Sequence, residues 1–571
     1  MLRQNALSRR VWESRYRHAP VSGAPERSVA DSWDRVARSL AACEPVHRPQ
    51  YEAEFRRVLD DFKFLPAGRI LAGAGTGRAV TLANCFVTGV LEDSIDGVFD
   101  RLKEGAVTMQ WGGGIGCDFS PLPPRGPVAA GPVAYMRIWD TMCESLASSG
   151  ARRGAMMGTL RCDHPDIEAF IAAKRDAAQL RNFNLSVLVT DDFMAALDAD
   201  VDWPLRFPGA EPAVSRRIPA SALWQSLMDA AYDSAEPGVL FIDRINRANN
   251  LYYCEQILAT NPCGEVPLPA HGACHLGSVN LPAFVRNAFA PGATLDFDAL
   301  DRTVATGVRM LDDVVDASAY PLPEQAEQAL ETRRIGLGVT GLADALIMLN
   351  LRYDSDAGRS LARRVLERLR DVAYRTATAL AEEKGSFPRF ERDAYLAAEY
   401  IRGLPDGIRD GIARHGVRNS HLLAIAPTGT ISVLANNVSS GIEPVFAAEG
   451  RRRVVDEDGA IHAHPVTDYA YALWTESAKK GALPGAFVTA AELSPDAHLD
   501  MLAALAPLVD NSISKTVNVP ADLPRSAFGG IYKRAYALGV KGCTVFRPNS
   551  VTGAVLSGEA LDCCAQARRM D

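Results

Sequence analysis

The chain has 571 residues, of which 47% are hydrophobic and 23% charged, and its formal net charge is −8. These values are ordinary for a folded globular protein, so disorder, collagen and a simple coiled coil are excluded as the overall class. The acidic balance provides no global basic field for duplex nucleic acid or an anionic membrane. The sequence has no run of eighteen apolar residues, so no transmembrane helix is predicted.

The N-terminal region, residues 1–65, has apolar positions at helical spacing and is predicted to be helical. Its first twenty residues are rich in arginine, as in an organelle transit sequence. Glu13 and the lack of serine-rich spacing favour a plain N-terminal arm instead.

From residue 66 to residue 550 the pattern predicts an α/β domain. Short apolar runs such as 185–189 and 239–242 alternate with long amphipathic stretches such as 358–384. This alternation indicates a sheet that is buried on both faces. The remaining residues, 551–571, have little to pack and predict a flexible C-terminal tail.

The segment 111–119, WGGGIGCDF, is rich in glycine. It contains no GxGxxG that opens a helix after a strand, and GxxxxGK[ST] does not occur in the chain, so a dinucleotide fold and a P-loop are not predicted. Two interpretations stay open: the glycines allow a tight loop, or they let the backbone approach another surface closely.

Eleven cysteines, an odd number, in a long chain without a secretion signal indicate a reducing compartment, and we expect a cytoplasmic protein. There is no CxxC pair and no nearby CxxH, so no protein-bound metal is predicted. Most of the cysteines are expected to be buried as small hydrophobic residues.

The most informative segment contains Asn261, Cys263 and Glu265, an amide, a thiol and a carboxylate at alternate positions. In an extended or looped backbone these side chains lie on one side and converge on one small ligand. A thiol beside a carboxylate has a raised pKa, which disfavours thiolate chemistry and favours a neutral S–H that gives up a hydrogen atom. The carboxylate is then suited to act as a general base towards a substrate hydroxyl, and the amide to hold that hydroxyl.

A second segment, 422–444, runs from an apolar strand into a predicted helix through APTGTIS. A glycine and several hydroxyls at this junction form a potential anion cradle, in which backbone N–H groups face a phosphate. The alternative is an ordinary capped helix start. The residues of this segment are Thr428, Gly429, Thr430, Ile431 and Ser432.

Taken together, these segments resemble the catalytic chain of ribonucleotide reductases, most closely the class II type that uses adenosylcobalamin. The resemblance extends from residue 64 to residue 550 and depends on many motifs in order, among them FLPAGRILAGAGT, LANCFV, WGGGIGCDFS, RNFNLSV, NPCGEVPL, ACHLGSVNL, RRIGLGVTGLADAL, APTGTIS, DNSISKTVNVP and KGCTVFRPNS. It implies a ten-stranded α/β barrel of two parallel five-stranded halves with a central finger loop. A short helical region, 1–65, precedes the barrel domain, 66–550, and the tail, 551–571, follows it.

The resemblance also implies roles for single residues. Cys263 resembles the cysteine that becomes a transient thiyl radical and takes the 3′ hydrogen of the ribose. Glu265 resembles the base that deprotonates the 3′ hydroxyl, and Asn261 resembles the residue that binds the hydroxyls. Cys85 and Cys274, 189 residues apart, resemble the pair that reduces the radical intermediate and becomes a disulfide. The APTGTIS segment resembles the loop that holds the substrate phosphates.

The source of the radical separates the classes of this family. Class I chains receive it from a metal subunit through tyrosines near the C-terminus of the catalytic chain, and the corresponding segment here, residues 541–547 (KGCTVFR), contains no tyrosine pair. Phenylalanine has no phenolic O–H for proton-coupled transfer. The tail contains no RxxGY-type glycyl-radical motif of class III, and the chain has no DxHxxG cobalamin motif. Class II with adenosylcobalamin is therefore predicted, and a class I catalytic subunit that needs a separate radical-generating subunit is the alternative.

Partners follow from the same resemblance: a ribonucleotide substrate, with a diphosphate favoured, and a deoxynucleotide effector read by a loop with Arg152, Arg153 and Gly154. The alternative for that loop is a basic surface loop.

Cys563 and Cys564 resemble the tail pair that re-reduces the active site with a thioredoxin- or glutaredoxin-type protein, or they are incidental tail thiols. The oligomeric state, including a homodimer, stays open, and neither a nucleic-acid polymer nor a membrane is expected as a partner.

Two interpretations from other classes are disfavoured. A non-catalytic nucleotide-binding regulator would have no need of the redox cysteines. A hydrolase that pairs Cys263 with His275 or His271 is disfavoured by the raised pKa expected for a thiol next to a carboxylate.

Overall fold

The computed structural model describes residues 4–20, 23–127, 129–147, 154–176, 178–209, 214–455, 461–477 and 483–549. Four residues with expected functions lie outside these ranges, namely Arg152 and Arg153 of the effector loop and Cys563 and Cys564 of the tail.

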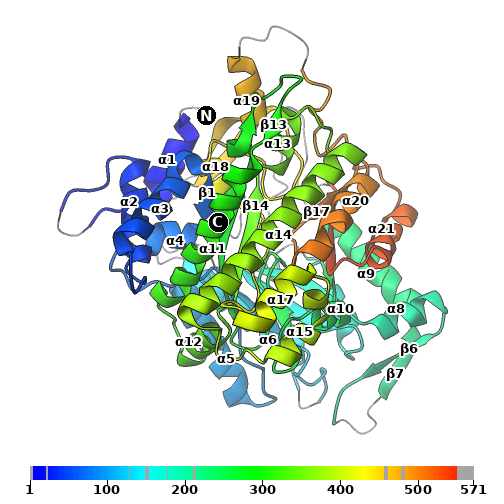
Figure 1. The fold of residues 1–571 in the computed structure, drawn as a ribbon. Coiled ribbons are helices and arrows are strands. Elements are labelled where there is room, and N and C mark those ends of the chain that lie inside the picture. The colour runs from blue at the N-terminus through cyan, green and yellow to red at the C-terminus, as the bar shows by residue number, and fades with distance from the viewer. Residues whose placement is uncertain are drawn as a thin grey trace.

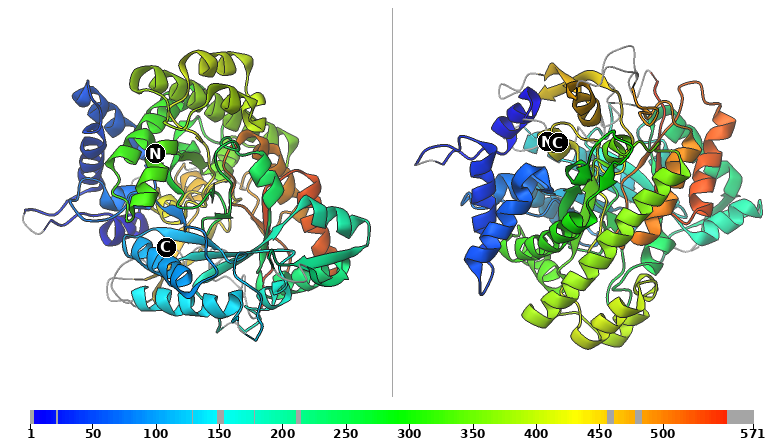
Figure 2. Two further views of the ribbon diagram at one scale, coloured as in Figure 1. Left: turned by 90° about the horizontal axis from the view of Figure 1, so that it is seen from below. Right: turned by 45° about the horizontal axis from the view of Figure 1, so that its top comes forward.

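The N-terminal region is helical, as predicted, and it lies at one flank of the molecule (Figures 1 and 2). It contains α1 (Ala6–Arg15), α2 (Val29–Ala41) and α3 (Arg48–Leu59). A capping box formed by Ser28 and Asp31 begins α2, and the buried side chains of Trp33, Val36 and Leu40 follow at helical spacing. These helices therefore use one apolar stripe to pack against the rest of the chain.

One half of the main sheet consists of five adjacent parallel strands. In spatial order they are β2 (Cys85–Val87), β3 (Gly114–Asp118), β4 (Met156–Arg161), β5 (Phe183–Val189) and β8 (Gly238–Phe241). Most of their residues are buried, which accounts for the continuous apolar runs in the sequence.

The second half runs in the opposite direction and joins the first half at two places. The strand β11 (Ala273–Asn280) is antiparallel to β2 and parallel to β14 (Ile335–Thr340), while β18 (Gly542–Phe546) is antiparallel to β8 and parallel to β17 (Thr516–Asn518). Single parallel bridges, Leu337–Leu423 and Ile425–Ile513, link β14 through residues 423–425 to the segment that leads into β17. A short additional strand, β1 (Phe64–Pro66), is antiparallel to β11.

This arrangement confirms the expected α/β fold with two parallel halves, and the junctions show that the halves run in opposite directions. The ladders themselves leave a gap between β14 and β17, which only the two single bridges span. At both antiparallel junctions, residues far apart in the sequence become neighbours. The connection between the halves therefore decides which side chains meet in the interior.

Helices cover the outside of the sheet, with the long α14 crossing one face (Figure 1). The helices after the N-terminal region are α4 (Gly68–Gly73), α5 (Ile95–Gln110), α6 (Pro132–Ala147), α7 (Ile167–Ile171), α8 (Asp191–Asp198), α9 (Ala220–Ser234), α10 (Ile242–Arg247), α11 (Phe297–Ala317), α12 (Pro323–Thr332), α13 (Leu342–Met348), α14 (Asp356–Lys384), α15 (Arg392–Ala397), α16 (Glu399–Arg402), α17 (Asp406–His415), α18 (Gly429–Leu434), α19 (Tyr469–Glu476), α20 (Pro495–Leu505) and α21 (Arg525–Ala537). Four two-stranded hairpins complete the fold: β6 (Asp202–Arg206) with β7 (Val214–Pro219), β9 (Ala259–Thr260) with β10 (Pro267–Leu268), β12 (Val285–Arg286) with β13 (Thr294–Leu295), and β15 (Glu449–Val455) with β16 (Ile461–Thr467).

A buried ion-pair network ties the N-terminal region to the helices behind it. Asp312, Asp313 and Asp316 bring carboxylate oxygens within 4.8 Å of one another. Lys384, at the end of α14, lies 2.9 Å from Asp313 and 3.1 Å from Glu44, which follows α2. Because a cation already pairs with these carboxylates, the cluster acts as a structural network, and losing one partner would leave an uncompensated buried charge.

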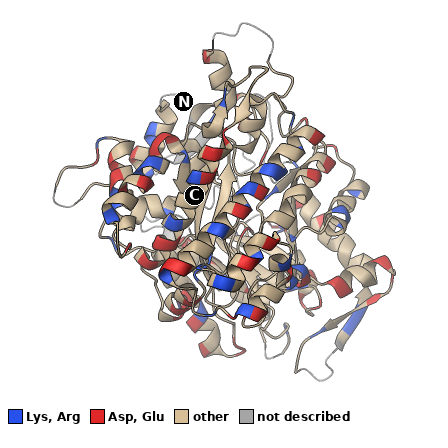
Figure 3. Ribbon diagram, viewed as in Figure 1, with Lys and Arg blue, Asp and Glu red and all other residues tan. Residues whose placement is uncertain are grey.

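Basic and acidic residues are interspersed along the ribbon in Figure 3. Neither sign of charge dominates the helices and strands drawn there, in agreement with the modest net charge. Among the described residues, no helix combines the length and the apolar character needed to cross a membrane.

Candidate active site

The segment with Asn261, Cys263 and Glu265 forms the tip of the β9–β10 hairpin. The Asn261 N–H donates to the Val266 carbonyl, and the Val266 N–H donates back to the Asn261 side chain at 2.9 Å. Gly264 has a φ of +82°, a conformation that suits glycine, and its N–H donates to the Asn261 carbonyl. These bonds close a tight loop, which we call the finger loop (residues 261–266).

The finger loop approaches the first half of the sheet very closely. A Cβ on Gly116 of β3 would lie 2.0 Å from the Thr260 carbonyl oxygen, and a Cβ on Gly114 would lie 3.3 Å from the Pro262 ring. In the glycine-rich segment 111–119, Gly116 therefore allows the backbone at Thr260 to approach β3 closely. The same segment also makes a tight turn, since Gly112 has a φ of +99°. Both interpretations left open by the sequence apply, each to a different glycine.

Both halves of the sheet hold the finger loop in place. The side-chain amide of Asn184, on β5, donates to the Pro262 carbonyl at 2.9 Å. From the other half, the Ser512 N–H donates to the Glu265 carbonyl at 3.0 Å. The loop is thus fixed between the two parallel sets of strands.

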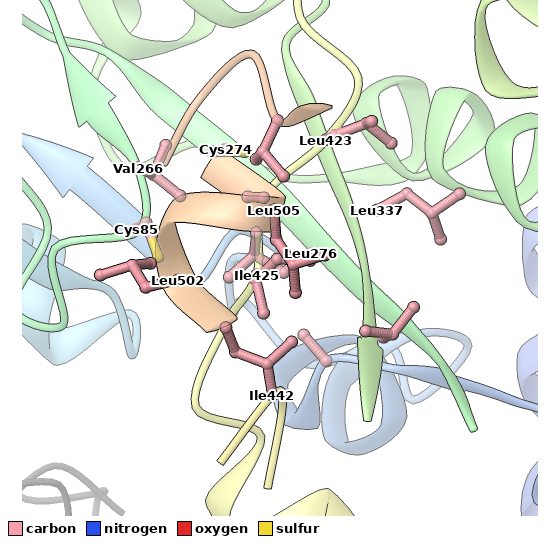
Figure 4. Packing of buried hydrophobic residues seen from close by; sticks show 14 of the residues in the cluster. Cys85, Val266, Cys274, Leu276, Leu337, Leu423, Ile425, Ile442, Leu502 and Leu505 are labelled. Carbon is pink, nitrogen blue, oxygen red and sulfur yellow. The ribbon is translucent and has the colours of Figure 1, made fainter. Parts of the chain in front are cut away.

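Two cysteines face each other beside this loop. Cys85 on β2 and Cys274 on β11 are directly paired residues of the antiparallel junction. Such partners have Cα atoms about 4.5–5.5 Å apart, inside the range of about 4.4–6.8 Å that a disulfide accepts. Both are buried free thiols, and Figure 4 shows them within the apolar cluster near Val266 and Leu276. Two residues 189 positions apart in the sequence are therefore cross-strand neighbours.

The finger loop contacts this thiol pair directly. The Asn261 side-chain amide donates to the Cys85 sulfur at 3.2 Å, and that sulfur lies 3.9 Å from Glu265 Oε1. An amide, a carboxylate and a thiol from two distant segments thus share one buried cluster, with Cys274 on the neighbouring strand.

Burial controls the electrostatics of the cluster. Desolvation raises the pKa of Glu265 to about 7, and its Oε2 has no hydrogen-bond partner in the described structure. Desolvation, followed by the charge of Glu265, raises the pKa of Cys85 well above its usual value, and desolvation raises the pKa of Cys274. At neutral pH both thiols are therefore S–H groups, while the carboxyl group is poised to accept or release a proton.

Cys263 is partly exposed and lines a cavity of about 150 Å³. The cavity is bounded by the finger loop, by β5 and β8 of one half, and by β17 and β18 of the other half. Thr544 and Cys543 of β18 contribute to its wall, and no tyrosine is present among the described residues that line it. A small molecule in this cavity would lie directly against the Cys263 thiol.

The APTGTIS segment lies at the edge of the same cavity, which Pro427 and Ser440 also line. Thr428 has a φ of +50° and precedes α18. Its hydroxyl is 2.8 Å from that of Thr340 and accepts from the Gly441 N–H at 2.9 Å, so it stabilises the local fold. The Ser432 hydroxyl likewise donates to the Thr428 carbonyl.

The outer part of this segment is more accessible. Gly429 and Thr430 are half-buried, whereas Ile431 and Ser432 are buried. The backbone N–H groups of the first turn, rather than the two engaged hydroxyls, are therefore the groups that could meet an anion here.

Of the expected effector loop, only Gly154 among the residues singled out lies in the described ranges. A Cβ on Gly154 would lie 2.6 Å from the sulfur of Cys143 and 2.7 Å from that of Met109. Gly154 thus packs closely against α5 and α6.

Sequence reasoning missed four residues of the cavity wall: Glu443, Lys515, Cys543 and Thr544. They belong to the quoted motifs DNSISKTVNVP and KGCTVFRPNS and to the end of segment 422–444, but no spacing rule connects them to Cys263. Only the pairing of β17, β18 and β8 brings them beside the finger loop.

Comparison with known proteins agrees with this geometry. Residues 83–546 match the barrel domain of ribonucleotide reductase, and residues 2–79 match the all-alpha domain of ribonucleotide reductase. The chain therefore belongs to the ribonucleotide reductase large-chain family.

Within the family, the chain is similar to proteins named vitamin B12-dependent ribonucleoside-diphosphate reductase. One, from Mycobacterium tuberculosis (strain CDC 1551 / Oshkosh), is 37% identical over 96% of this chain and 80% of that relative. Another, from Thermoplasma acidophilum, is 37% identical over 89% of this chain and 66% of that relative. A ribonucleoside-diphosphate reductase subunit alpha from Chlamydia pneumoniae is 26% identical over 72% of this chain and 45% of that relative.

Proposed function

We propose that this chain reduces ribonucleotides, with diphosphates favoured, to 2′-deoxyribonucleotides for DNA synthesis, and that it uses adenosylcobalamin to do so. The observation that carries the proposal is the buried cluster in which paired Cys85 and Cys274 meet Asn261 and Glu265 of the finger loop. The same loop presents Cys263 to a cavity.

In this proposal Cys263, as a thiyl radical, takes the 3′ hydrogen of the ribose. Glu265 accepts the 3′ hydroxyl proton, and a pKa of about 7 suits a group that takes and returns a proton at neutral pH. Asn261 holds the substrate hydroxyls.

The reduction itself is assigned to Cys85 and Cys274. The 2′ hydroxyl leaves as water, the two thiols supply two electrons and two protons, and a disulfide forms between them. Their raised pKa values keep both as S–H, the form that carries the hydrogens needed in this step. The Cys263 hydrogen then returns to the 3′ carbon.

The cavity beside Cys263 fits the reactive part of the cofactor. It adjoins the thiol, and the described residues that line it include no tyrosine whose phenol could serve a radical path. Bound there, adenosylcobalamin would supply, by cleavage of its cobalt–carbon bond, the oxidising equivalent that removes the Cys263 hydrogen.

The class I alternative is less well supported. The relatives from Mycobacterium tuberculosis and Thermoplasma acidophilum, at 37% identity, are named B12-dependent, whereas the subunit alpha from Chlamydia pneumoniae is 26% identical. The two histidines weighed for a hydrolase have other partners, since His275 Nε2 lies 3.3 Å from the Tyr320 hydroxyl and His271 Nδ1 lies 3.1 Å from Glu104.

The proposal extends to three groups of partners. The first turn after Thr428 would meet the substrate phosphates, and the loop with Arg152, Arg153 and Gly154 would respond to a deoxynucleotide effector. A thioredoxin- or glutaredoxin-type protein would re-reduce the active site, in a cytoplasmic setting and with a homodimer as one assembly. These partners follow from the family resemblance.

The decisive experiment is anaerobic incubation of the single purified chain with adenosylcobalamin, a small dithiol and each nucleotide. We expect deoxynucleotide and a cob(II)alamin signal without any second protein subunit. If product forms only after addition of a metal-containing subunit, the class I alternative is correct instead.

The role of the tail cysteines is tested by comparing turnover with two different reductants. We expect the double substitution Cys563→Ser, Cys564→Ser to lower turnover driven by a thioredoxin-type protein, while a small dithiol restores much of the rate. Equal thioredoxin-driven turnover in the double variant and the wild type would assign these two thiols no role.

A further inference from the structure

The cavity beside Cys263 has an unusual balance of charge for a nucleotide-binding protein. Its charged lining residues in the described structure are Glu236, Glu443 and Lys515. Lys515 is buried, and its ammonium contacts Glu443 Oε2 at 2.5 Å, His498 Nδ1 at 2.9 Å and the Thr516 carbonyl at 2.5 Å. An ammonium has three N–H donors, so these contacts use all of them. The lining therefore offers a phosphate no uncommitted ammonium, and each of its two carboxylates is paired with a lysine.

Glu443 is held in a fixed position and still faces the cavity. One of its oxygens accepts from Lys515, and the other accepts from the Thr516 N–H at 2.8 Å. The side chain remains 23% exposed, in contrast to the fully buried Lys515. Each carboxylate oxygen can accept about two hydrogen bonds, so each has one acceptor site left. Two adjacent acceptors on a rigid carboxylate match two adjacent hydroxyl donors.

The second carboxylate of the cavity differs in this respect. One oxygen of Glu236 accepts from Lys174 at 2.8 Å and the other from the Leu185 N–H at 3.0 Å, and the side chain is only 7% exposed. Glu236 thus stabilises the wall between β5 and β8. It provides a matched control for Glu443.

We propose that Glu443 binds the vicinal 2′ and 3′ hydroxyls of an uncharged nucleoside, the 5′-deoxyadenosyl group of the cofactor, beside Cys263. The inference rests on the proposed function and extends it to a specific residue. Lys515 and Thr516 orient the carboxylate, and a lining without an uncommitted ammonium favours a nucleoside without phosphate.

The test measures binding of a nucleoside, not turnover. The full-length chain, with saturating cytidine diphosphate to fill the substrate site, is titrated calorimetrically with 5′-deoxyadenosine and with 2′,3′,5′-trideoxyadenosine, which lacks both hydroxyls. Because hydrogen bonds to an ionised acceptor are among the stronger ones, the wild type should prefer 5′-deoxyadenosine by about tenfold or more. In Glu443→Gln this preference should fall to about twofold or less, whereas Glu236→Gln should retain it.

Glu443→Gln leaves the buried Lys515 without its anion, so folding is checked by thermal unfolding. The double variant Glu443→Gln, Lys515→Met removes both charges and should show the same loss of preference. Equal binding of the two nucleosides by the wild type overturns the proposal, and so does an undiminished preference in either folded variant.

Parallel measurement of cobalamin-dependent turnover in the wild type separates the two levels of the argument. Turnover without a preference for the hydroxylated nucleoside refutes the role of Glu443 and leaves the proposed function intact. If the preference depends on Glu443 but the wild type shows no turnover, the proposed function is refuted and the nucleoside site is still supported.

Discussion

Replacing Gly116 with alanine should displace the finger loop and so remove most of the activity. The added Cβ would lie 2.0 Å from the Thr260 carbonyl oxygen, whereas real Cβ contacts are essentially never shorter than 3.0 Å. Since that oxygen belongs to the backbone, the hairpin must move by about 1 Å. A misplacement of this size near reacting groups can reduce a rate by about 100-fold. The crowded core should also lose about 1–3 kcal/mol of unfolding free energy.

Gly114 provides a matched control on the same strand. A Cβ there would lie 3.3 Å from the Pro262 ring, so a shift of a few tenths of an ångström relieves it. Both variants are compared with the wild type by turnover and by urea unfolding. We expect Gly114→Ala to keep activity within about threefold of the wild type, since its displacement is several times smaller. If Gly116→Ala matches Gly114→Ala in turnover and stability, the close approach does not control the position of Cys263.

Three further predictions concern the cluster itself. Cys263→Ser should fold normally but form no deoxynucleotide, because the serine O–H bond is too strong to enter the hydrogen-atom exchange; measurable turnover would refute the radical assignment. Cys85→Ser or Cys274→Ser should replace product by substrate breakdown detectable by chromatography, while Cys117→Ser, at a buried cysteine outside the cluster, should keep normal product. Because burial raises the pKa of Glu265 from 4.5 to about 7 and the base acts as the carboxylate, turnover should fall as pH drops through about 7; a midpoint near 4.5 would contradict this role.

The raised pKa of Glu265 also has a consequence for stability. A carboxyl group whose pKa is raised on folding binds its proton more tightly in the folded state, so it favours folding at low pH and disfavours it above pH 7. The partnerless Oε2 is part of the same cost. The fold therefore maintains a destabilising group at the point where the proposed reaction needs a base.

The sequence by itself determined the local chemistry of this protein. The alternation of Asn261, Cys263 and Glu265 predicted an amide, a thiol and a carboxylate on one side of a loop. The structure has all three in the finger loop, with Asn261 and Glu265 at Cys85 and with Cys263 at the cavity. Helical spacing in residues 1–65 identified the N-terminal helices, and apolar runs identified strands buried on both faces. Ordered motifs then identified the family, which the matches over 2–79 and 83–546 confirm.

Only the tertiary structure decided which distant residues meet. The antiparallel junction of β2 and β11 pairs Cys85 with Cys274, and the junction of β8 and β18 brings Thr544 to the cavity beside Cys263. A glycine is required at position 116 because the backbone oxygen of Thr260, 144 positions away in the sequence, leaves no room for a Cβ. Periodicity reports which face of an element is buried, but it carries no information about the partner strand. Strand pairing across long loops depends on how the whole apolar surface packs, and for that reason the thiol pair, the base and the cavity become one site only in the folded chain.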